Sequence, residues 1–171
     1  MVYQEGIYVG YKWYETADEE GFFNGVSNAY GTGYDAVVQY PFGYGLSYTE
    51  FEWEATPSWS ADENLSATGE YTVEVTVHNT GDTAGKDVVQ LYYTPPYTQG
   101  GIEMASVNLL AFAKTDLIQP GESQTVTLTF DTYDLASYDY NDANGNQFSG
   151  YETVPGDYEI CLMKNSHTDG I

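Results

Sequence analysis

One short run of the chain gathers oxygen-bearing side chains of the kind that bind calcium. It extends from Asp139 to Asn146 and reads Asp-Tyr-Asn-Asp-Ala-Asn-Gly-Asn. An EF-hand loop needs oxygen ligands at its alternate positions 1, 3 and 5, and a glycine at position 6. Counted from Asp139, position 5 is Ala143 and position 6 is Asn144. Because this register fails, the run is predicted to be a hairpin loop, and no metal site is assigned.

The histidines and the cysteine would supply two other kinds of chemistry, zinc binding and thiol catalysis. His78 and His167 are far apart in the sequence and have no Cys or His companion at ligand spacing, so no zinc site is predicted. Cys161 is the single cysteine, which excludes an internal disulfide, and it lies in an apolar, strand-like run. Its thiol is predicted to act as a small buried hydrophobic group. The sequence predicts no cofactor.

Aromatic side chains in the first 47 residues are candidates for sugar binding. Their rings pair with the apolar faces of pyranoses, and Tyr and Trp add a polar tip. The possible carbohydrate contacts are Trp13, Tyr14, Tyr30 and Tyr34. The other explanation for this aromatic content, which we favour, is a cluster at an interface between domains.

The charge of the chain limits its partners. Its 171 residues include four Lys, no Arg and 26 Asp plus Glu, for a formal net charge of −22. Such a surface repels phosphate backbones and anionic lipids, so neither nucleic acid nor a membrane is expected as a partner. Neutral carbohydrate is compatible with this charge, which also serves solubility.

From residue 70 onward, apolar and polar side chains alternate with the period of two that is typical of half-buried strands. In the expected register Val75 and Leu128 point inward, whereas Thr76 and Thr127 point outward. Short strands with turn signals between them, and no sustained helical period, predict an all-β, antiparallel sandwich. The expected strands after the first are residues 70–78, 87–94, 107–114, 123–131 and 158–164.

The chain divides into an arm, residues 1–47, and a sandwich, residues 48–171. Tyr48, Phe51 and Trp53 are expected to supply the first strand of the sandwich. The arm has one strand-like run, Ile7 to Tyr14, and a loop rich in Gly, Asn and Tyr, which together cannot close a core. The joint between the arm and the sandwich is predicted to be anchored by Phe42, Tyr44 and Leu46.

Motifs in order along the chain resemble one enzyme family. Residues 9–14 read Val-Gly-Tyr-Lys-Trp-Tyr, and residues 41–49 read Pro-Phe-Gly-Tyr-Gly-Leu-Ser-Tyr-Thr. Val-Val-Gln-Leu-Tyr follows at 88–92, Pro-Gly-Glu at 120–122 and Pro-Gly-Asp-Tyr at 155–158. Together they resemble the end of the second domain and the fibronectin type III-like domain of glycoside hydrolase family 3 β-glucosidases.

The resemblance implies an immunoglobulin- or fibronectin type III-like sandwich, preceded by an arm from an incomplete α/β domain. The family's nucleophile is an aspartate in a Ser-Asp-Trp-like context on a TIM-like barrel, and its acid/base is usually a glutamate in the middle of the second domain. Neither a Ser-Asp-Trp nor a Lys-His-Phe motif occurs here, and a barrel needs about 200 residues or more. Glu5 stands where the resembling enzymes begin the last strand of that domain. No catalytic residue is therefore assigned.

Three functions are compatible with these features. The first is a non-catalytic accessory domain of a family 3 glycoside hydrolase, which buttresses the parent enzyme's sugar-cleaving domains as its partners. The second is a carbohydrate-binding module, which a row of Tyr or Trp on a solvent-facing sheet would favour. The third is a self-assembling structural protein whose arm joins a neighbouring copy.

No positively charged, apolar leader begins the sequence. If the protein is exported, the export signal is expected outside this chain. An extracellular or cell-surface location is expected rather than a cytoplasmic one.

Overall fold

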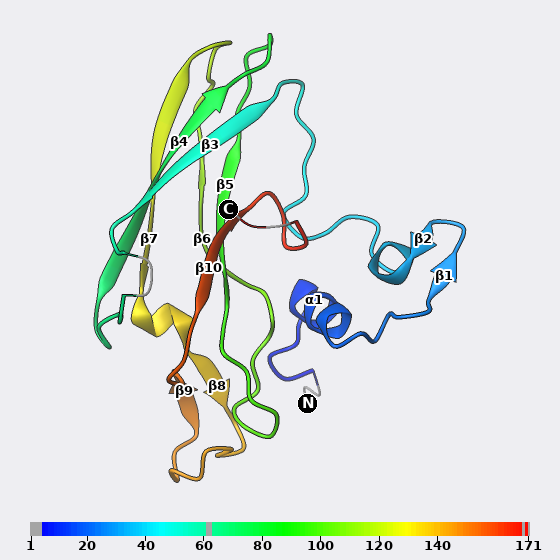
Figure 1. Cartoon of the computed structure of the whole chain (residues 1–171), viewed down its shortest axis with the longest axis vertical. Helices are drawn as coiled ribbons and strands as arrows, with labels where there is room; N and C mark the ends of the chain where they lie inside the picture. Colours follow the sequence, from blue (N-terminus) through cyan, green and yellow to red (C-terminus); the bar gives the residue numbers. More distant parts are fainter. Residues whose placement is uncertain (1–4, 61–62, 169, 171) are drawn as a thin grey trace.

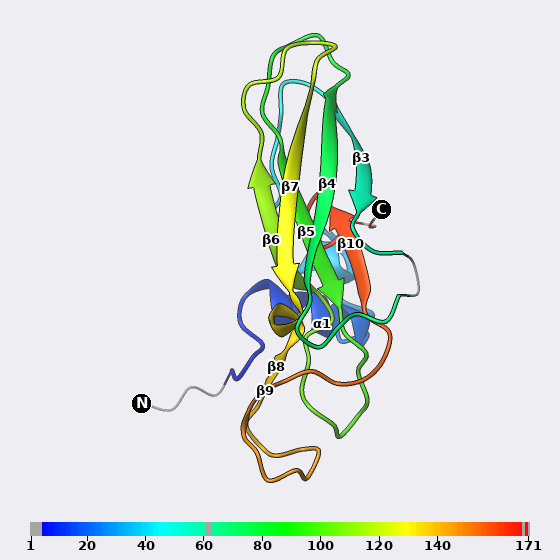
Figure 2. The same cartoon turned by 90° about the vertical axis from the view of Figure 1, so that its left-hand side faces the viewer.

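Two three-stranded antiparallel sheets pack face to face in the computed structural model, which describes residues 5–60, 63–168 and 170 (Figures 1 and 2). The first sheet has the order β3-β4-β7 and the second the order β10-β5-β6. This arrangement confirms the predicted β-sandwich. The first sheet consists of β3 (Phe51–Pro57), β4 (Glu70–Asn79) and β7 (Ser123–Asp131), and the second of β5 (Val88–Thr94), β6 (Asn108–Lys114) and β10 (Glu159–Met163).

The register of the first sheet follows the alternation in the sequence. Val75 of β4 pairs with Val126 of β7 and is fully buried, and Leu128 is 2% exposed. On the opposite face Thr76 and Thr125 join their hydroxyls at 2.9 Å. The predicted inward and outward faces are therefore confirmed for both strands. Of the residues expected in the first strand, Phe51 and Trp53 lie in β3, whereas Tyr48 precedes it and is 98% exposed.

A buried asparagine fixes the corner where β4 leaves the first sheet. The Asn79 amide donates to the carbonyl oxygens of Thr83 and Ile118 at 2.8 and 2.9 Å. Its side-chain oxygen accepts from the Thr49 hydroxyl and from the Gly81 N–H. All its hydrogen-bonding groups are thus satisfied, which is the condition for burying an amide without a large cost.

One carboxylate connects the two sheets at their edges. Asp87 Oδ2 accepts hydrogen bonds from Trp53 Nε1 at 2.8 Å and from Lys164 Nζ at 3.0 Å. The same Lys164 ammonium lies 3.6 Å from the centroid of the Trp53 ring. Strand β3 of one sheet is thereby tied to the end of β10 in the other.

The oxygen-rich run identified in the sequence is a hairpin loop, as predicted. It connects β8 (Ser137–Asp139) to β9 (Gly150–Glu152), and the 3-10 helix η2 (Thr132–Leu135) precedes the hairpin. The Asp139 carboxylate accepts the backbone N–H groups of Asn141 and Ala143. Its oxygens therefore stabilise the turn. Among the described residues, no three His, Cys, Asp or Glu side chains are grouped in a way that could hold a metal ion.

The arm contains the helix α1 (Tyr11–Glu19), the short strands β1 (Ser27–Asn28) and β2 (Gly31–Thr32), and the 3-10 helix η1 (Gly33–Ala36). The predicted strand from Ile7 to Tyr14 is therefore wrong. Residues 5–10 form turns, in which Gly6 and Gly10 have positive φ (+58° and +60°), and the chain then enters the helix. The inward side chains Tyr11 and Glu15 are four residues apart, which is the spacing of one helix face. The alternating aromatic residues before Glu15 had indicated a strand instead. Within the described residues, no helix is both long enough and apolar enough to cross a bilayer.

Candidate functional site

The arm packs on the outer face of the β10-β5-β6 sheet, where Tyr11 of α1 is the central contact. The Tyr11 ring stacks on Phe42 with centroids 4.5 Å apart and meets Tyr92 of β5 edge-on at 6.4 Å. Its hydroxyl oxygen accepts the backbone N–H of Leu109 in β6 at 2.8 Å. In addition, the Gln90 amide of β5 donates to the carbonyl oxygen of Gly43 at 3.2 Å. The arm thus forms a third layer over this sheet (Figure 1).

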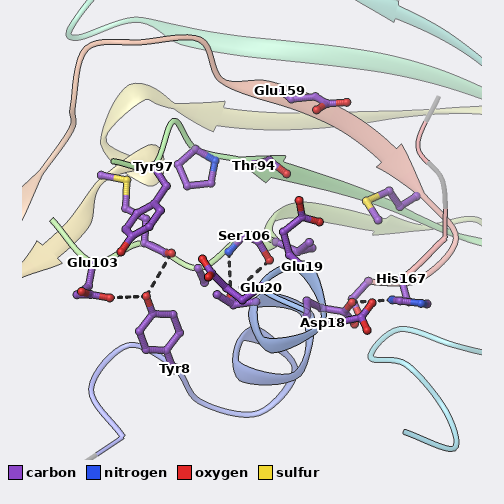
Figure 3. A pocket seen from close by; sticks show the side chains of 18 residues that line it. Tyr8, Asp18, Glu19, Glu20, Thr94, Tyr97, Glu103, Ser106, Glu159 and His167 are labelled. Atoms are coloured by element: carbon purple, nitrogen blue, oxygen red, sulfur yellow. Dashed lines mark hydrogen bonds and ion pairs between the residues drawn. The ribbon is translucent and has the colours of Figure 1, made fainter. Parts of the chain in front are cut away.

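A cleft of about 940 Å³ lies between α1 and the segment that joins β5 to β6 (Figure 3). Two hydrogen-bonded contacts cross it. The Tyr8 hydroxyl donates to the Glu103 carboxylate at 2.6 Å, and the Ser106 N–H donates to the Thr16 hydroxyl at 2.9 Å. The cleft is therefore a seam between the arm and the sandwich, spanned by polar contacts.

The most buried charged group of this seam is the Glu15 carboxylate, at 4% exposure of the residue. Its Oε1 accepts from the Tyr34 hydroxyl at 2.5 Å and from the Ser166 hydroxyl at 2.7 Å. Its Oε2 lies 2.9 Å from His167 Nδ1. The His167 ring also stacks on Tyr34, with centroids 3.6 Å apart. We call these four residues the Glu15 cluster; it joins α1 and η1 of the arm to the turn that follows β10.

The phenols of the seam act as hydrogen-bond donors. Burial raises the pKa of Tyr34, and the hydrogen bond to the Glu15 carboxylate raises it further. Burial and the bond to Glu103 raise the pKa of Tyr8 in the same way. Both hydroxyls consequently keep their protons at neutral pH and hold the carboxylates that accept from them.

The Glu15 and Glu103 carboxylates of the cleft fasten the arm to the sandwich. A retaining glycosidase needs two carboxyl groups about 5 Å apart across a sugar-shaped pocket. Both carboxylate oxygens of Glu15 are bonded to protein groups, and Glu103 is bonded to Tyr8. The other carboxylates that line the cleft are Asp18, Glu19, Glu20 and Glu159.

The four candidate carbohydrate contacts do not form one surface. Trp13 and Tyr14 are 40% and 37% exposed and meet edge-to-face, whereas Tyr30 is 90% exposed in the tight turn between β1 and β2. Tyr34 is 6% exposed and stacks on His167, so its ring lies in the interior of the Glu15 cluster. Moreover, the solvent-facing side of β3-β4-β7 carries Glu and Thr side chains, with no row of Tyr or Trp along these strands.

The predicted joint residues behave differently from one another. Phe42 stacks on Tyr11, and its carbonyl oxygen accepts the Ser166 N–H at 2.9 Å. Tyr44 stacks on Tyr40, also in the arm, at 5.2 Å. Leu46 is 89% exposed and anchors nothing in the part of the chain that the structure describes.

Sequence reasoning missed Glu15 and treated His167 as a lone histidine. The two residues are 152 positions apart, so no local spacing relates them. One feature of the sequence could have indicated Glu15: it follows Tyr11 by four residues, so the two share one face if the segment is a helix. In the structure that face points inward.

Away from the seam, α1 and the turn after it expose an aromatic face. The rings of Trp13 and Phe22 lie 6.1 Å apart, and both also contact Phe23. Phe22 is 70% exposed. We call Trp13, Tyr14 and Phe22 the outer arm face.

Comparison with known proteins agrees with this architecture. A fibronectin type III-like domain is matched at residues 87–166. Beta-glucosidase A of Butyrivibrio fibrisolvens is 42% identical over 146 residues, which are 80% of this chain and 16% of that protein. A beta-glucosidase of Rhizobium radiobacter is 41% identical over 164 residues, or 96% of this chain and 16% of that protein.

Solved structures give the same result. The fold matches that of a β-glucosidase from Paenibacillus barengoltzii with a TM-score of 0.75 and 38% identity, over 97% of this chain and 16% of the other. It matches β-glucosidase 3B from Thermotoga neapolitana, solved in complex with glucose, with a TM-score of 0.66 and 36% identity, over 98% and 19%. The chain spans less than a fifth of the length of each of these relatives. It corresponds to the part of glycoside hydrolase family 3 β-glucosidases that carries their fibronectin type III-like domain.

Proposed function

We propose that this chain is a non-catalytic accessory part of a family 3 glycoside hydrolase, and that it buttresses the sugar-cleaving domains. The observation that carries the proposal is the two-sided arm. One side of the arm is bonded to the sandwich through Tyr11 and the Glu15 cluster. Its other side is the outer arm face, which is exposed. An apolar surface of this kind marks an interaction site.

The comparisons support a partner inside the same enzyme. Relatives that match 80–97% of the chain are about five to seven times longer, since the matched part is 13–20% of their length. In this proposal the sandwich provides the rigid base, and the outer arm face docks on the preceding α/β domain. The chain contributes stability and orientation, and the catalytic carboxylates come from the other domains.

The proposal is tested by association in trans. The crystallised β-glucosidase of P. barengoltzii is prepared without the segment that matches this chain, and the chain is then added. We expect a complex in light scattering and a raised melting temperature of the truncated enzyme. Trp13→Ser and Phe22→Ser should weaken both effects.

Leu117→Ser is the matched control, because Leu117 is also exposed, at 55%, but lies after β6, outside the arm. It should leave the association unchanged. Association that is insensitive to Trp13 and Phe22, or no association at all, would contradict the proposed docking.

A further inference from the structure

A second aromatic surface lies around the β8–β9 hairpin, at the end of the sandwich where Thr132 of η2 bonds to Ser66 and Gly69 of the β3–β4 connection. Tyr138 and Tyr151 are direct cross-strand partners with ring centroids 5.2 Å apart. Tyr133 of η2 extends the group, 5.8 Å from Tyr151. The three residues are 64% (Tyr133), 42% (Tyr138) and 57% (Tyr151) exposed. We call them the hairpin tyrosines.

The backbone beneath these rings is held firmly by side chains. Asp131 and Asp134 form a reciprocal capping box at η2. In the loop, Asp139 accepts two backbone N–H groups, and the amides of Asn144 and Asn146 both donate to Glu152 Oε2. Rings on a fixed backbone lose little conformational freedom when a ligand binds, which favours recognition.

The polar groups around the rings define the chemistry of the ligand. The hydroxyls of the hairpin tyrosines make no hydrogen bond to any described residue, so they are available to a ligand. Free phenols at the edge of exposed apolar rings suit a ligand that has both hydroxyl groups and apolar faces.

The local charge excludes the main alternatives. No Lys, Arg or His occurs from residue 115 to residue 163, whereas Asp139, Asp142 and Glu152 belong to the hairpin and Asp131 and Asp134 to the η2 turn before it. Phosphorylated, sulfated or carboxylated ligands would be repelled. A neutral, polyhydroxylated ligand satisfies both the rings and the charge.

We propose that the hairpin tyrosines form a secondary binding surface for a neutral oligosaccharide. The choice of β-linked glucose units rests on the proposed function, whereas the surface itself rests on the hairpin alone. This surface is separate from the aromatic residues of the arm, and it would hold a glucan chain beside the enzyme rather than cleave it.

The test is a titration of the full chain, with ¹³C-labelled tyrosine, by cellohexaose, followed by NMR. We expect the resonances of the hairpin tyrosines to shift. Tyr151→Ala and, independently, Tyr133→Ala should each weaken binding about tenfold, the upper range of an aromatic contact. Tyr48→Ala, which removes an isolated tyrosine that is 98% exposed, should leave binding unchanged.

Each other outcome overturns the proposal. Absence of shifts, or shifts that persist in both hairpin variants with their melting temperatures unchanged, would mean that these rings do not bind the sugar. A dimer in light scattering that Tyr133→Ala disrupts would mean that the surface joins two copies instead. The titration needs no other domain, so its result is independent of the test for docking.

Discussion

At the scale of single residues, the attachment of the arm depends on a buried carboxylate. Glu15 is 4% exposed, and it receives hydrogen bonds from Tyr34, Ser166 and His167. Removing one partner of a buried polar network leaves the others without hydrogen bonds, which costs more than the intact bonds contribute. Glu15 is therefore more sensitive to substitution than the exposed carboxylates of the same helix.

We predict that Glu15→Ala lowers the free energy of unfolding by about 2–4 kcal/mol, because two hydroxyls and an imidazole lose their acceptor. Glu15→Gln keeps the shape and an acceptor oxygen, so its cost should be smaller. Urea unfolding measures both, with Glu19→Ala, an exposed carboxylate of α1, as the control. Equal stability of the wild-type chain and Glu15→Ala would refute the role of the cluster.

The single cysteine should be unreactive at neutral pH. Burial raises the pKa of the Cys161 thiol to about 11, and the neighbouring Glu159 carboxylate raises it in the same direction. Since the thiolate is the reactive form, the rate of alkylation by iodoacetamide should rise about tenfold per pH unit from pH 7.5 to 9.5 without levelling. Glu159→Gln should increase the rate at pH 8. A rate that levels near pH 8.5, as for a free thiol, would contradict this assignment.

At the scale of elements, the inward faces of β4 and β7 should carry the stability of the sandwich. Val75→Ala and Leu128→Ala should each cost about 2–4 kcal/mol, because each leaves a cavity in a packed core. Thr76→Ala and Thr127→Ala, on the opposite faces, should cost well under that. Thermal and urea unfolding of the four variants provide the comparison. Similar losses on both faces would mean that the strand register is shifted by one residue.

The strands could be predicted because their pattern is local, whereas the arm could not. Val73, Val75 and Val77 alternate with polar residues. In a strand, such alternation places all the valines on one face, which must be the inward one. In the arm, Tyr11 and Trp13 suggest the same period, but the contact that selects the helix is between Tyr11 and strand β5. Tertiary contacts of this kind override a short local pattern, and the partner of Glu15, His167, is found only when the chain is folded.

At the scale of the whole molecule, the arm is held at the seam but open at its far side. Limited proteolysis of the dilute chain should cut first between Asp18 and Asp35, where side chains from Asn24 to Tyr30 are exposed, and spare residues 48–164. Tyr11→Ala should accelerate this cleavage, because it removes the stack on Phe42 and the bond to Leu109. Tyr133→Ala should not. First cleavage within β4 or β7 would reverse the assigned order of stability.

The proposed division of labour places the chemistry of the parent enzyme outside this chain. The Glu103 carboxylate is engaged with Tyr8 and the Glu15 carboxylate with its cluster, and the exposed outer arm face is suited to docking. This assignment depends on the chain being unable to cleave a glycoside by itself.

The most direct measurement is the hydrolysis of an aryl β-glucoside by the purified chain alone. The account predicts a rate equal to that of the buffer, and the same rate for Glu103→Gln. Turnover above the buffer rate that Glu5→Gln or Glu103→Gln abolishes would show a catalytic carboxylate within these 171 residues, and the accessory role would be wrong.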